Sequence, residues 1–420
     1  MKARYMTILF LIIFTLSFNI VVYADAPEGK GTEENPYMIY TVEDLRRVGS
    51  DEEWSLDKHY KLMNDIILEK PEEGKSNWTP IGGESGKSFT GTFDGNGKTI
   101  TGMTITSAYG NAIGLFARLT GEKAMIENLG LLDVKIIMDE YDKLEWPPTG
   151  GLVGVNWLGT VRNCYSTGFV SVRTSMLGGL VGLNEGLVDG CYSSVNVRCN
   201  DFLYNGSTGG LIGYISHVSI DAVCQKSYAT GNVYGTTAGG LIGNMDGGMI
   251  IDCYSTASVS GQQFVGGLIG TQNSGTIKNC YVVGNVTGEK NIVSKVDMRN
   301  GDAGGICPWP SGDILNCVVL SEKISSYQSI AGEITCYDTS EYTKYNYILE
   351  DTTLIYNAEP SKKGNIYRSK KELTSQKFYE SIGWKFTGED AVWEFSGEYK
   401  LPKLIGVGGQ DELVTPKHLQ

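Results

Sequence analysis

Short apolar runs alternate with glycine and small polar residues through the middle of the chain. From Gly150 the sequence reads GGLVGVNWLGTVRNCYSTGFVSV, in which GLVG, GTVRN and GFVSV are short β-prone runs. Gly, Asn or Ser stands between the runs, where tight turns are expected. No stretch of this unit keeps the period of an amphipathic helix. The pattern therefore predicts three short β-strands per unit, joined by turns.

The same pattern recurs along the chain at intervals of 28, 31, 30, 27 and 38 residues. A weaker opening copy starts at Ala112, which makes seven units. Each later copy opens on a pair of glycines, at Gly150, Gly178, Gly209, Gly239, Gly266 and, in degenerate form, Gly304. Repeats of this length are typical of solenoids.

The length and content of the unit suit one turn of a parallel β-helix. Leucine-rich repeats of similar length need an L-x-x-L-x-L spacing that is missing, and propeller blades are longer, at about 40 residues. Stacked turns would pair every strand with its equivalents above and below, which satisfies the backbone hydrogen bonds. We therefore predict an all-β fold, a parallel β-helix (β-solenoid) of about seven turns with short α/β segments at both ends.

A cysteine or serine occupies one phase of the repeat, and a tyrosine follows in most copies. Equivalent residues in neighbouring turns stack about 4.8 Å apart. We expect a buried column of free thiols, with disulfides between turns as the alternative, and a ladder of stacked tyrosines on another face. The column would hold Cys164, Cys191, Ser227, Cys253, Cys280 and Cys317, and the ladder Tyr165, Tyr192, Tyr228, Tyr254 and Tyr281.

The GGLVG and GTVRNCYSTG elements resemble the GLUG-motif repeats of bacterial exported proteins, over about Ala112 to Val319. Such repeats occur in adhesin-like and haemagglutinin-like surface proteins, and upstream of the protease domain in immunoglobulin A-specific metallopeptidases. The segments GTEENPYMIYTVEDLRRV and SKKELTSQKFYESIGWKF resemble those that flank such repeats. The resemblance implies a parallel β-helix and a role in surface binding, and it brings no catalytic residues to transfer.

The start of the chain has the build of a secretory signal peptide. Lys2 and Arg4 precede the apolar run MTILFLIIFTLSFNIVV, and small residues follow in VVYADA. We predict a secreted or cell-surface protein that does not insert in the membrane after cleavage. No cysteine follows the apolar run to carry a lipid, and LPKLIG at Leu401 departs from the sortase signal L-P-x-T-G.

The repeat and its flanks divide the chain into five segments. The signal peptide occupies 1–24, an N-terminal cap and opening segment 25–111, and the repeat coil 112–320. Further turns and a cap occupy 321–405, and a flexible tail is expected over 406–420. Capping boxes predict short helices after Thr41 and after Ser369. Trp384, Trp393 and Tyr399 are expected to cover the last turn.

Charge and motif content exclude several classes of function. The formal net charge of −13 disfavours nucleic acid and anionic membranes as partners. None of the three histidines lies in an H-E-x-x-H motif, and no G-x-S-x-G motif occurs. GGLVG also lacks the lysine and hydroxyl residue of a phosphate-binding loop. We expect no cofactor, no metal site and no catalytic residue.

Polysaccharide cleavage stays open as an alternative, because it needs only paired carboxylates on neighbouring turns. Asp189, Asp246, Asp252 and Asp313 recur near the start of the second strand, although Asx turns explain them as well. A structural spacer is a further alternative.

The segments in which the units differ are the candidates for binding. Insertions at 139–149, 199–208, 288–302 and 321–368 interrupt the repeat, and several of them carry aromatic residues. Such side chains beside Asn and Asp suit sugar recognition, and they equally suit packing. We predict a non-catalytic, adhesin-type binding protein that recognises a glycan or a host or cell-surface protein. The candidate ligand-binding residues are Trp146, Trp157, Phe202 and Tyr204.

Overall fold

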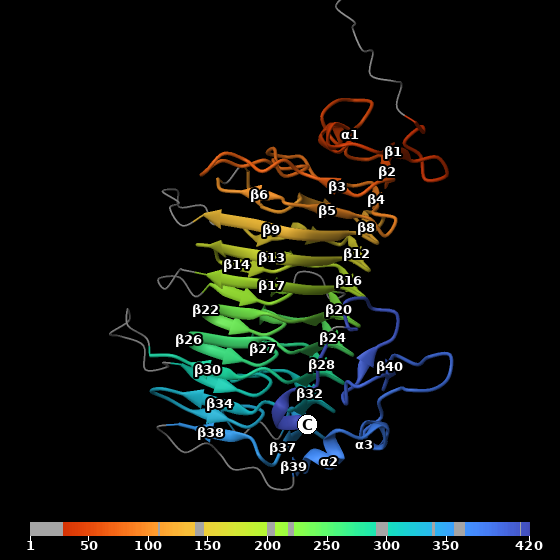
Figure 1. Cartoon of the computed structure of the whole chain (residues 1–420). Helices are drawn as coiled ribbons and strands as arrows, with labels where there is room; N and C mark the ends of the chain where they lie inside the picture. Colours follow the sequence, from red (N-terminus) through yellow and green to blue (C-terminus); the bar gives the residue numbers. More distant parts are fainter. Residues whose placement is uncertain are drawn as a thin grey trace, which may run out of the picture.

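The computed structural model describes residues 28–107, 110–138, 147–199, 206–216, 222–290, 301–337, 341–356, 366–411 and 413–420. The chain forms a parallel β-solenoid of about nine turns, which confirms the predicted fold class (Figure 1). The number of turns exceeds the predicted seven because strands before Ala112 and after residue 320 join the same sheets. The predicted signal peptide lies outside the described residues.

Each turn of the coil contributes strands to three parallel sheets, called here sheets A, B and C. Sheet A has 11 strands and sheet C has six. The strands of sheet A are β1 (Tyr37–Ile39), β2 (His59–Leu62), β4 (Thr92–Asp94), β8 (Met125–Glu127), β12 (Thr160–Arg162), β16 (Leu187–Asp189), β20 (Val223–Gln225), β24 (Met249–Ile251), β28 (Thr276–Lys278), β32 (Asp313–Leu315) and β36 (Thr343–Lys344). Those of sheet C are β7 (Phe116–Thr120), β11 (Val153–Trp157), β15 (Val181–Asn184), β19 (Ile212–Ile215), β23 (Ile242–Met245) and β27 (Ile269–Gln272).

Sheet B is the largest, with 22 strands, because most turns contribute more than one strand to it. Its first strands are β3 (Ile66–Ile67), β5 (Thr99–Thr101), β6 (Thr104–Ile105), β9 (Gly130–Met138), β10 (Thr149–Gly150), β13 (Tyr165–Val172), β14 (Met176–Gly178), β17 (Tyr192–Cys199), β18 (Ser207–Gly209), β21 (Tyr228–Ala229) and β22 (Asn232–Gly239). The others are β25 (Tyr254–Ser255), β26 (Ser258–Gly266), β29 (Tyr281–Val282), β30 (Val286–Gly288), β31 (Asp302–Gly304), β33 (Val318–Val319), β34 (Lys323–Ser326), β35 (Ala331–Gly332), β37 (Tyr347–Leu349), β38 (Thr353–Ile355) and β39 (Tyr367–Arg368).

The remaining elements lie at the two ends of the chain. The helices are α1 (Val42–Arg47), α2 (Lys370–Leu373), α3 (Gln376–Ser381) and the 3-10 helix η1 (Lys417–Leu419), and β40 (Trp393–Glu394) pairs antiparallel with β41 (Lys403–Leu404). Both predicted capping boxes are confirmed: the side chain of Thr41 accepts from the amide of Asp44, and that of Ser369 accepts from the amide of Glu372. No helix in the ranges given above is long and apolar enough to span a membrane.

The predicted column of thiols lies inside the coil. All nine cysteines fall within the described residues, where each is buried and none forms a disulfide. The Sγ of Cys164 lies 3.1 Å from the carbonyl oxygen of Arg162, and the Oγ of Ser227 donates over 2.6 Å to that of Gln225. Each side chain thus reaches the carbonyl two residues before it. This shared bond explains why serine replaces cysteine in one turn.

The corner between sheets A and B precedes this column and adopts a left-handed conformation. Asn163, Asp252, Asn279 and Asn316 have φ of 49°, 54°, 53° and 54°. Asn and Asp tolerate this region better than other non-glycine residues, because their short polar side chains bond locally. The amide of Asn279 also donates over 3.0 Å to Asp252 of the turn before. Hydrogen bonds between turns therefore reinforce the corner.

The predicted tyrosine ladder is confirmed on the outer surface of sheet B. The rings of Tyr165 and Tyr192 stack with centroids 4.7 Å apart and planes 1° apart. The same stacking continues through Tyr228, Tyr254 and Tyr281, with centroids 4.7–4.9 Å apart. One planar ring per turn matches the spacing of parallel strands.

The C-terminal part of the chain covers most of this ladder. Residues 366–411 and 413–420, called here the strap, run along the side of the coil (Figure 1). The hydroxyl of Tyr228 donates to the carbonyl of Gly408, and that of Tyr281 to the carbonyl of Pro402, both over 2.8 Å. The ring of Trp393 lies 6.0 Å from that of Tyr281. The aromatic residues expected over the last turn pack on the side of the coil.

The strap also includes the segment for which the sequence predicts a flexible tail. Leu419 is buried within the cluster that contains the ladder, and the imidazole of His418 lies 2.7 Å from the carbonyl oxygen of Leu320. Gln410 is buried as well. Within 406–420, Gln410, Thr415 and Leu419 are therefore held against the protein, whereas many of the other described residues are exposed.

Candidate functional site

Three of the four predicted ligand-binding residues, Trp146, Phe202 and Tyr204, lie outside the described residues. The strands that precede them are described. β9 ends at Met138 and β17 ends at Cys199, and both residues pair with Val172 of β13. The strands that precede the two insertions therefore end at the same position of the turn.

The fourth candidate, Trp157, lies at the end of β11 on the outer surface of sheet C, where 46% of it is exposed. Its neighbour Asn156 points into the coil and is fully buried. Asn156 pairs with Asn184 of the next turn, and Met245 pairs with Gln272 further along. The residues that follow these inner positions therefore line up with Trp157 along the coil.

This alignment brings together side chains that are far apart in the sequence. They comprise an indole, two carboxylates, an amide and one phenol from the adjacent column. We call them the Trp157 row: Trp157, Glu185, Tyr214, Asp246 and Asn273. Sequence reasoning found Trp157 as a binding candidate and Asp246 only as one of four recurring aspartates. Glu185, Asp246 and Asn273 stand after the same inner position in GLVGLNE, GLIGNMD and GLIGTQN, so an alignment of the units contains them, whereas Tyr214 stands before that position in its unit.

Buried amides hold the backbone beneath the row. The side-chain nitrogen of Asn156 donates over 2.8 Å to the side-chain oxygen of Asn184, and over 3.0 Å to the carbonyl of Gly159. Asn184 in turn donates over 2.9 Å to the carbonyl of Gly186. These bonds tie the backbones of two neighbouring turns together, although the Oδ1 of Asn156 accepts no hydrogen bond from the described residues. Trp157 and Glu185 are therefore presented from a fixed corner of the coil.

Hydrogen bonds also orient the lower part of the row. The hydroxyl of Tyr214 and the side-chain amide of Asn273 both donate to the carboxylate of Asp246. Burial, the hydrogen bond to Asp246 and the charge of Glu185 together raise the pKa of Tyr214 above its ordinary value. The phenol therefore stays protonated and keeps donating to the carboxylate at neutral pH.

The chemistry of the row suits binding better than catalysis. Glu185 and Asp246 are separated by two turns, which places their backbones about 9–10 Å apart along the coil. Both carboxylate oxygens of Asp246 already accept a hydrogen bond from the protein, one from Tyr214 and one from Asn273. The surface instead offers an exposed aromatic face with fixed hydrogen-bonding groups beside it.

The four aspartates that the sequence singles out lie on different faces. Asp189 lies in sheet A and pairs with Arg162 over 3.5 Å, and Asp313 is exposed in β32 of the same sheet. Asp252 occupies the left-handed corner, where it accepts from the indole of Trp393 over 3.2 Å. Asp246 belongs to the Trp157 row. The four aspartates therefore do not form a pair of catalytic carboxylates. Only Asp252 stands in the turn directly before a cysteine, where the sequence predicted an Asx turn.

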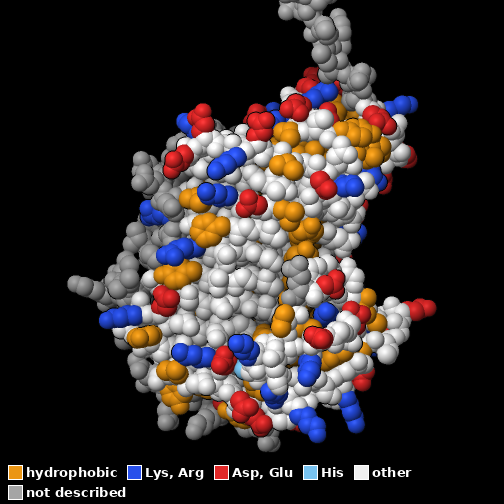
Figure 2. Space-filling view, in the orientation of Figure 1, with side chains coloured by type: hydrophobic (Ala, Val, Ile, Leu, Met, Phe, Trp, Pro, Cys, Tyr) orange, Lys and Arg blue, Asp and Glu red, His pale blue; other side chains and the backbone are white. Residues whose placement is uncertain are grey.

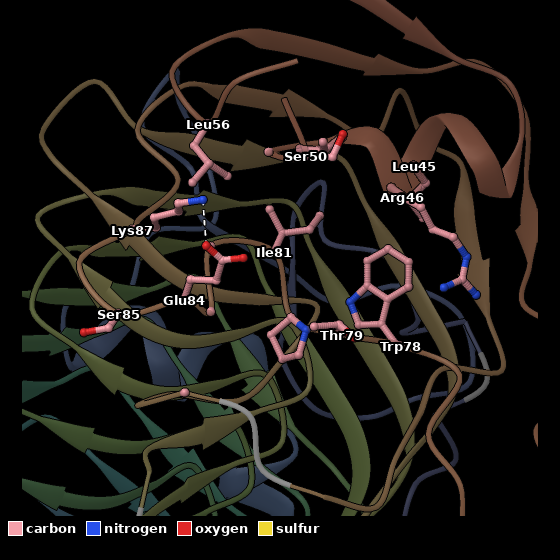
Figure 3. A pocket seen from close by; sticks show the side chains of 16 residues that line it. Leu45, Arg46, Ser50, Leu56, Trp78, Thr79, Ile81, Glu84, Ser85 and Lys87 are labelled. Atoms are coloured by element: carbon pink, nitrogen blue, oxygen red, sulfur yellow. Dashed lines mark ion pairs between the residues drawn. The ribbon is translucent and has the colours of Figure 1, made fainter. Parts of the chain in front are cut away.

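A cavity of about 620 Å³ lies in the N-terminal cap, between α1 and the loop that follows Trp78 (Figure 3). Trp78 is buried, and its indole donates over 3.1 Å to the carbonyl of Leu115. Arg46 donates to the carbonyl of Asn77, and Lys87 pairs with Glu84 over 2.6 Å. These polar groups already bond to other groups of the protein, so the cavity is best described as a gap at the boundary between the cap and the coil. No cluster of three His, Cys, Asp or Glu side chains suited to a metal occurs in the described ranges.

Known proteins match the repeats of this chain. The GLUG motif family matches residues 149–173, 234–260 and 263–287. Halomucin of Haloquadratum walsbyi is 31% identical over 160 residues, which is 37% of this chain and 2% of halomucin. A protein of Evansella cellulosilytica that carries the name Gly-rich membrane protein is 37% identical over 128 residues, 30% of this chain and 14% of that protein. The chain thus spans a small part of both relatives.

A solved structure also resembles the coil. It is the crystal structure of a protein from Bacteroides ovatus described as an immunoglobulin A1 protease, with 19% identity and a TM-score of 0.45. The alignment covers 90% of this chain and 94% of that one. The family matches fall on the units that stack as turns, with glycine, Cys and Tyr at equivalent positions. Three segments of the chain are therefore GLUG repeats, and they lie in a parallel β-helix.

Proposed function

We propose that this protein is a non-catalytic binding protein of the cell surface or its surroundings, of adhesin type, and that the Trp157 row contacts a glycan. The observation that carries the proposal is the exposed indole of Trp157 on a rigid corner, in line with Glu185, Asp246 and Asn273. Two relatives support the location, since one is a mucin by name and the other a membrane protein by name.

The row has the two elements that sugar recognition needs. An aromatic face stacks on the apolar side of a sugar ring, and polar side chains beside it bond the hydroxyl groups. Ionised carboxylates accept hydrogen bonds and donate none, and the amide of Asn273 adds a donor. Because Asp246 is oriented by Tyr214 and Asn273, little side-chain entropy remains to be lost on binding.

The test is binding of the mature protein to a glycan array and to cells, with the variant Trp157→Ala. Aromatic anchors often contribute 2 kcal/mol or more, so we expect Trp157→Ala to weaken binding at least tenfold. Met249→Ala is the matched control, because Met249 is similarly exposed, at 41%, but lies on sheet A.

Four outcomes would contradict the proposal. Binding to no glycan or cell would remove its basis, and equal binding of Trp157→Ala and the parent protein would exclude the row. Release of oligosaccharides from a polysaccharide panel would show an enzyme in place of a binding protein. Binding to cells that survives removal of their glycans would identify a host or cell-surface protein as the partner.

A further inference from the structure

A second outer surface of the coil carries neither charged nor apolar side chains. It lies on sheet B, which faces the viewer in Figure 1, and it forms the pale area in the middle of Figure 2. Its members are serines, threonines and asparagines that point outward from five consecutive turns. We call it the neutral face: Thr167, Ser194, Asn196, Thr230, Asn232, Thr256, Ser258 and Asn285.

Charged residues surround this face and stay out of it. One residue in five of the chain is charged, and water-facing positions are where such side chains normally lie. Asp133 and Lys135 stand in the turn before the face, and Glu322 and Lys323 in the turn after it. Arg198 lies at its margin, with its guanidinium 4.9 Å from the ring centroid of Tyr234.

Hydrogen bonds between turns fix the side chains of the neutral face. The Oγ1 of Thr230 donates over 2.9 Å to the Oγ of Ser194. The side-chain nitrogen of Asn232 donates over 3.0 Å to the side-chain oxygen of Asn196. Because equivalent strands lie about 4.8 Å apart, the hydroxyl and amide groups repeat at that interval along two parallel columns.

One column changes its chemistry where the strap begins to cover it. Its uncovered positions are Thr167, Ser194, Thr230 and Thr256, and it continues as Val283 and Leu320. Val283 and Leu320 are buried in the cluster that includes the strap. The column is therefore apolar where the protein covers it and carries hydroxyl groups where it stays open.

We infer that the neutral face binds an extended, neutral polysaccharide, whose chain lies along the coil. This inference rests on the proposed function as a glycan-binding protein and assigns it a second surface. A face without charge attracts neither polyanions nor polycations. Evenly spaced hydroxyl and amide groups match a polymer that repeats its own hydroxyl groups at a similar interval. Protein interfaces differ in kind, because they are enriched in aromatic residues, Met and Arg and depleted in Ser.

Aromatic side chains border the neutral face on both long sides. Tyr165, and Tyr192 against which Gly408 and Gly409 of the strap pack, are partly exposed on one side. Tyr234 stands in the column on the other side, and Phe169, 38% exposed, precedes Asn196 at the end of its column. Such rings offer apolar faces to a sugar chain that lies between them.

The test is retention of the full-length mature protein on cellulose, chitin and a β-1,3-glucan, compared with the anionic polymers alginate and heparin. The variant Asn196→Lys/Ser258→Lys places two separated charges and two long side chains on the neutral face. Thr160→Lys/Thr276→Lys adds the same charge to sheet A and is the matched control. All four positions face outward, and circular dichroism with a melting curve verifies folding of each variant.

We expect retention on at least one neutral polysaccharide and on neither anionic polymer, a loss of at least tenfold with Asn196→Lys/Ser258→Lys, and no loss with the control. Retention on no neutral polysaccharide, or equal loss in both double variants, would overturn the inference. Loss with Trp157→Ala alone would overturn it as well while leaving the proposed function intact. A dimer that the neutral-face variant dissociates would assign the face to a second copy of the chain.

Discussion

The hydroxyl of Tyr254 donates a hydrogen bond of 3.0 Å to the side-chain oxygen of Gln410, 156 residues further along the chain. That same oxygen accepts from the amide of Leu404, and the nitrogen of the Gln410 side chain donates to the carbonyls of Leu404 and Val407. One buried glutamine therefore shapes a turn of the strap and ties it to the middle of the tyrosine ladder. The strap braces the coil from the side.

The strap should contribute strongly to stability through Trp393. Its side chain is fully buried against the ladder and bonds Asp252. Because Trp→Ala in a core removes much apolar contact, Trp393→Ala should lower the free energy of unfolding by about 3–5 kcal/mol. Urea unfolding measures this change in free energy. Trp157→Ala is the control at an exposed position, and its free energy of unfolding should lie within about 0.5 kcal/mol of the parent. Similar losses in both variants would show that the strap adds no stability.

The left-handed corner predicts a contrast between two substitutions of Asn279. Glycine adopts a φ of 53° freely, whereas a β-branched residue is strained there. Asn279→Gly should cost about 1 kcal/mol for the lost hydrogen bond to Asp252, and Asn279→Val about 1–3 kcal/mol more. Thermal unfolding of the two variants side by side measures the difference. A valine variant as stable as the glycine variant would refute this account of the corner.

Asp252 predicts a stabilising substitution with a definite pH dependence. Burial raises the pKa of its carboxyl group, against the opposing hydrogen bonds from Asn279 and Trp393. A raised pKa means that the folded state holds the proton more tightly, so stability is greatest below the ordinary value of 3.8 and falls as pH rises through the folded pKa. Asp252→Asn should therefore melt at a higher temperature at pH 7.

The gain from Asp252→Asn should shrink as pH falls towards 3.8, where the parent carboxyl also becomes neutral. Asparagine keeps the left-handed conformation that it already adopts at Asn163 and Asn316. Melting curves recorded by circular dichroism at both pH values measure the effect. A gain of equal size at both pH values would show that the charge is not its cause.

The thiol column predicts that the cysteines react slowly in the folded protein and that the stability of the fold decreases in alkali. Burial raises the pKa of Cys253, Cys280 and Cys317 well above the ordinary value of 9.0. Unfolded thiols ionise near that value while folded ones stay protonated, so these groups take stability away as pH rises above about 9. A thiol reagent should modify none of the nine cysteines in the native protein and all of them after denaturation.

Cys253→Ser is the matched variant for the thiol column. It should fold, because Ser227 already makes the equivalent bond to the carbonyl two residues before it. It should also release one reactive thiol fewer on denaturation and lose less stability in alkali. A count below nine in the denatured, unreduced parent protein would reveal a disulfide.

The repeat made many tertiary contacts predictable. Tyr192 follows Cys191 as Tyr165 follows Cys164, and the parallel register brings the like residues together. The Trp157 row was only partly predictable. Trp157 differs from its equivalents, which drew attention to it, whereas the sequence does not distinguish Glu185 from an ordinary surface residue or Asp246 from a turn residue. The bond from Tyr214 to Asp246 joins two turns and two columns, and it has no signature in either unit.

The sequence by itself determined the coil, its register and its stacked columns, because the repeat period equals one turn and neighbouring turns bury like residues against each other. Only the tertiary structure decided which parts of the columns are covered. The strap meets Tyr228, Tyr254 and Tyr281 through bonds that span 180, 156 and 121 residues, between a periodic segment and one without any repeat. Its position depends on the fit of the strap to an apolar surface that exists only once the turns have stacked.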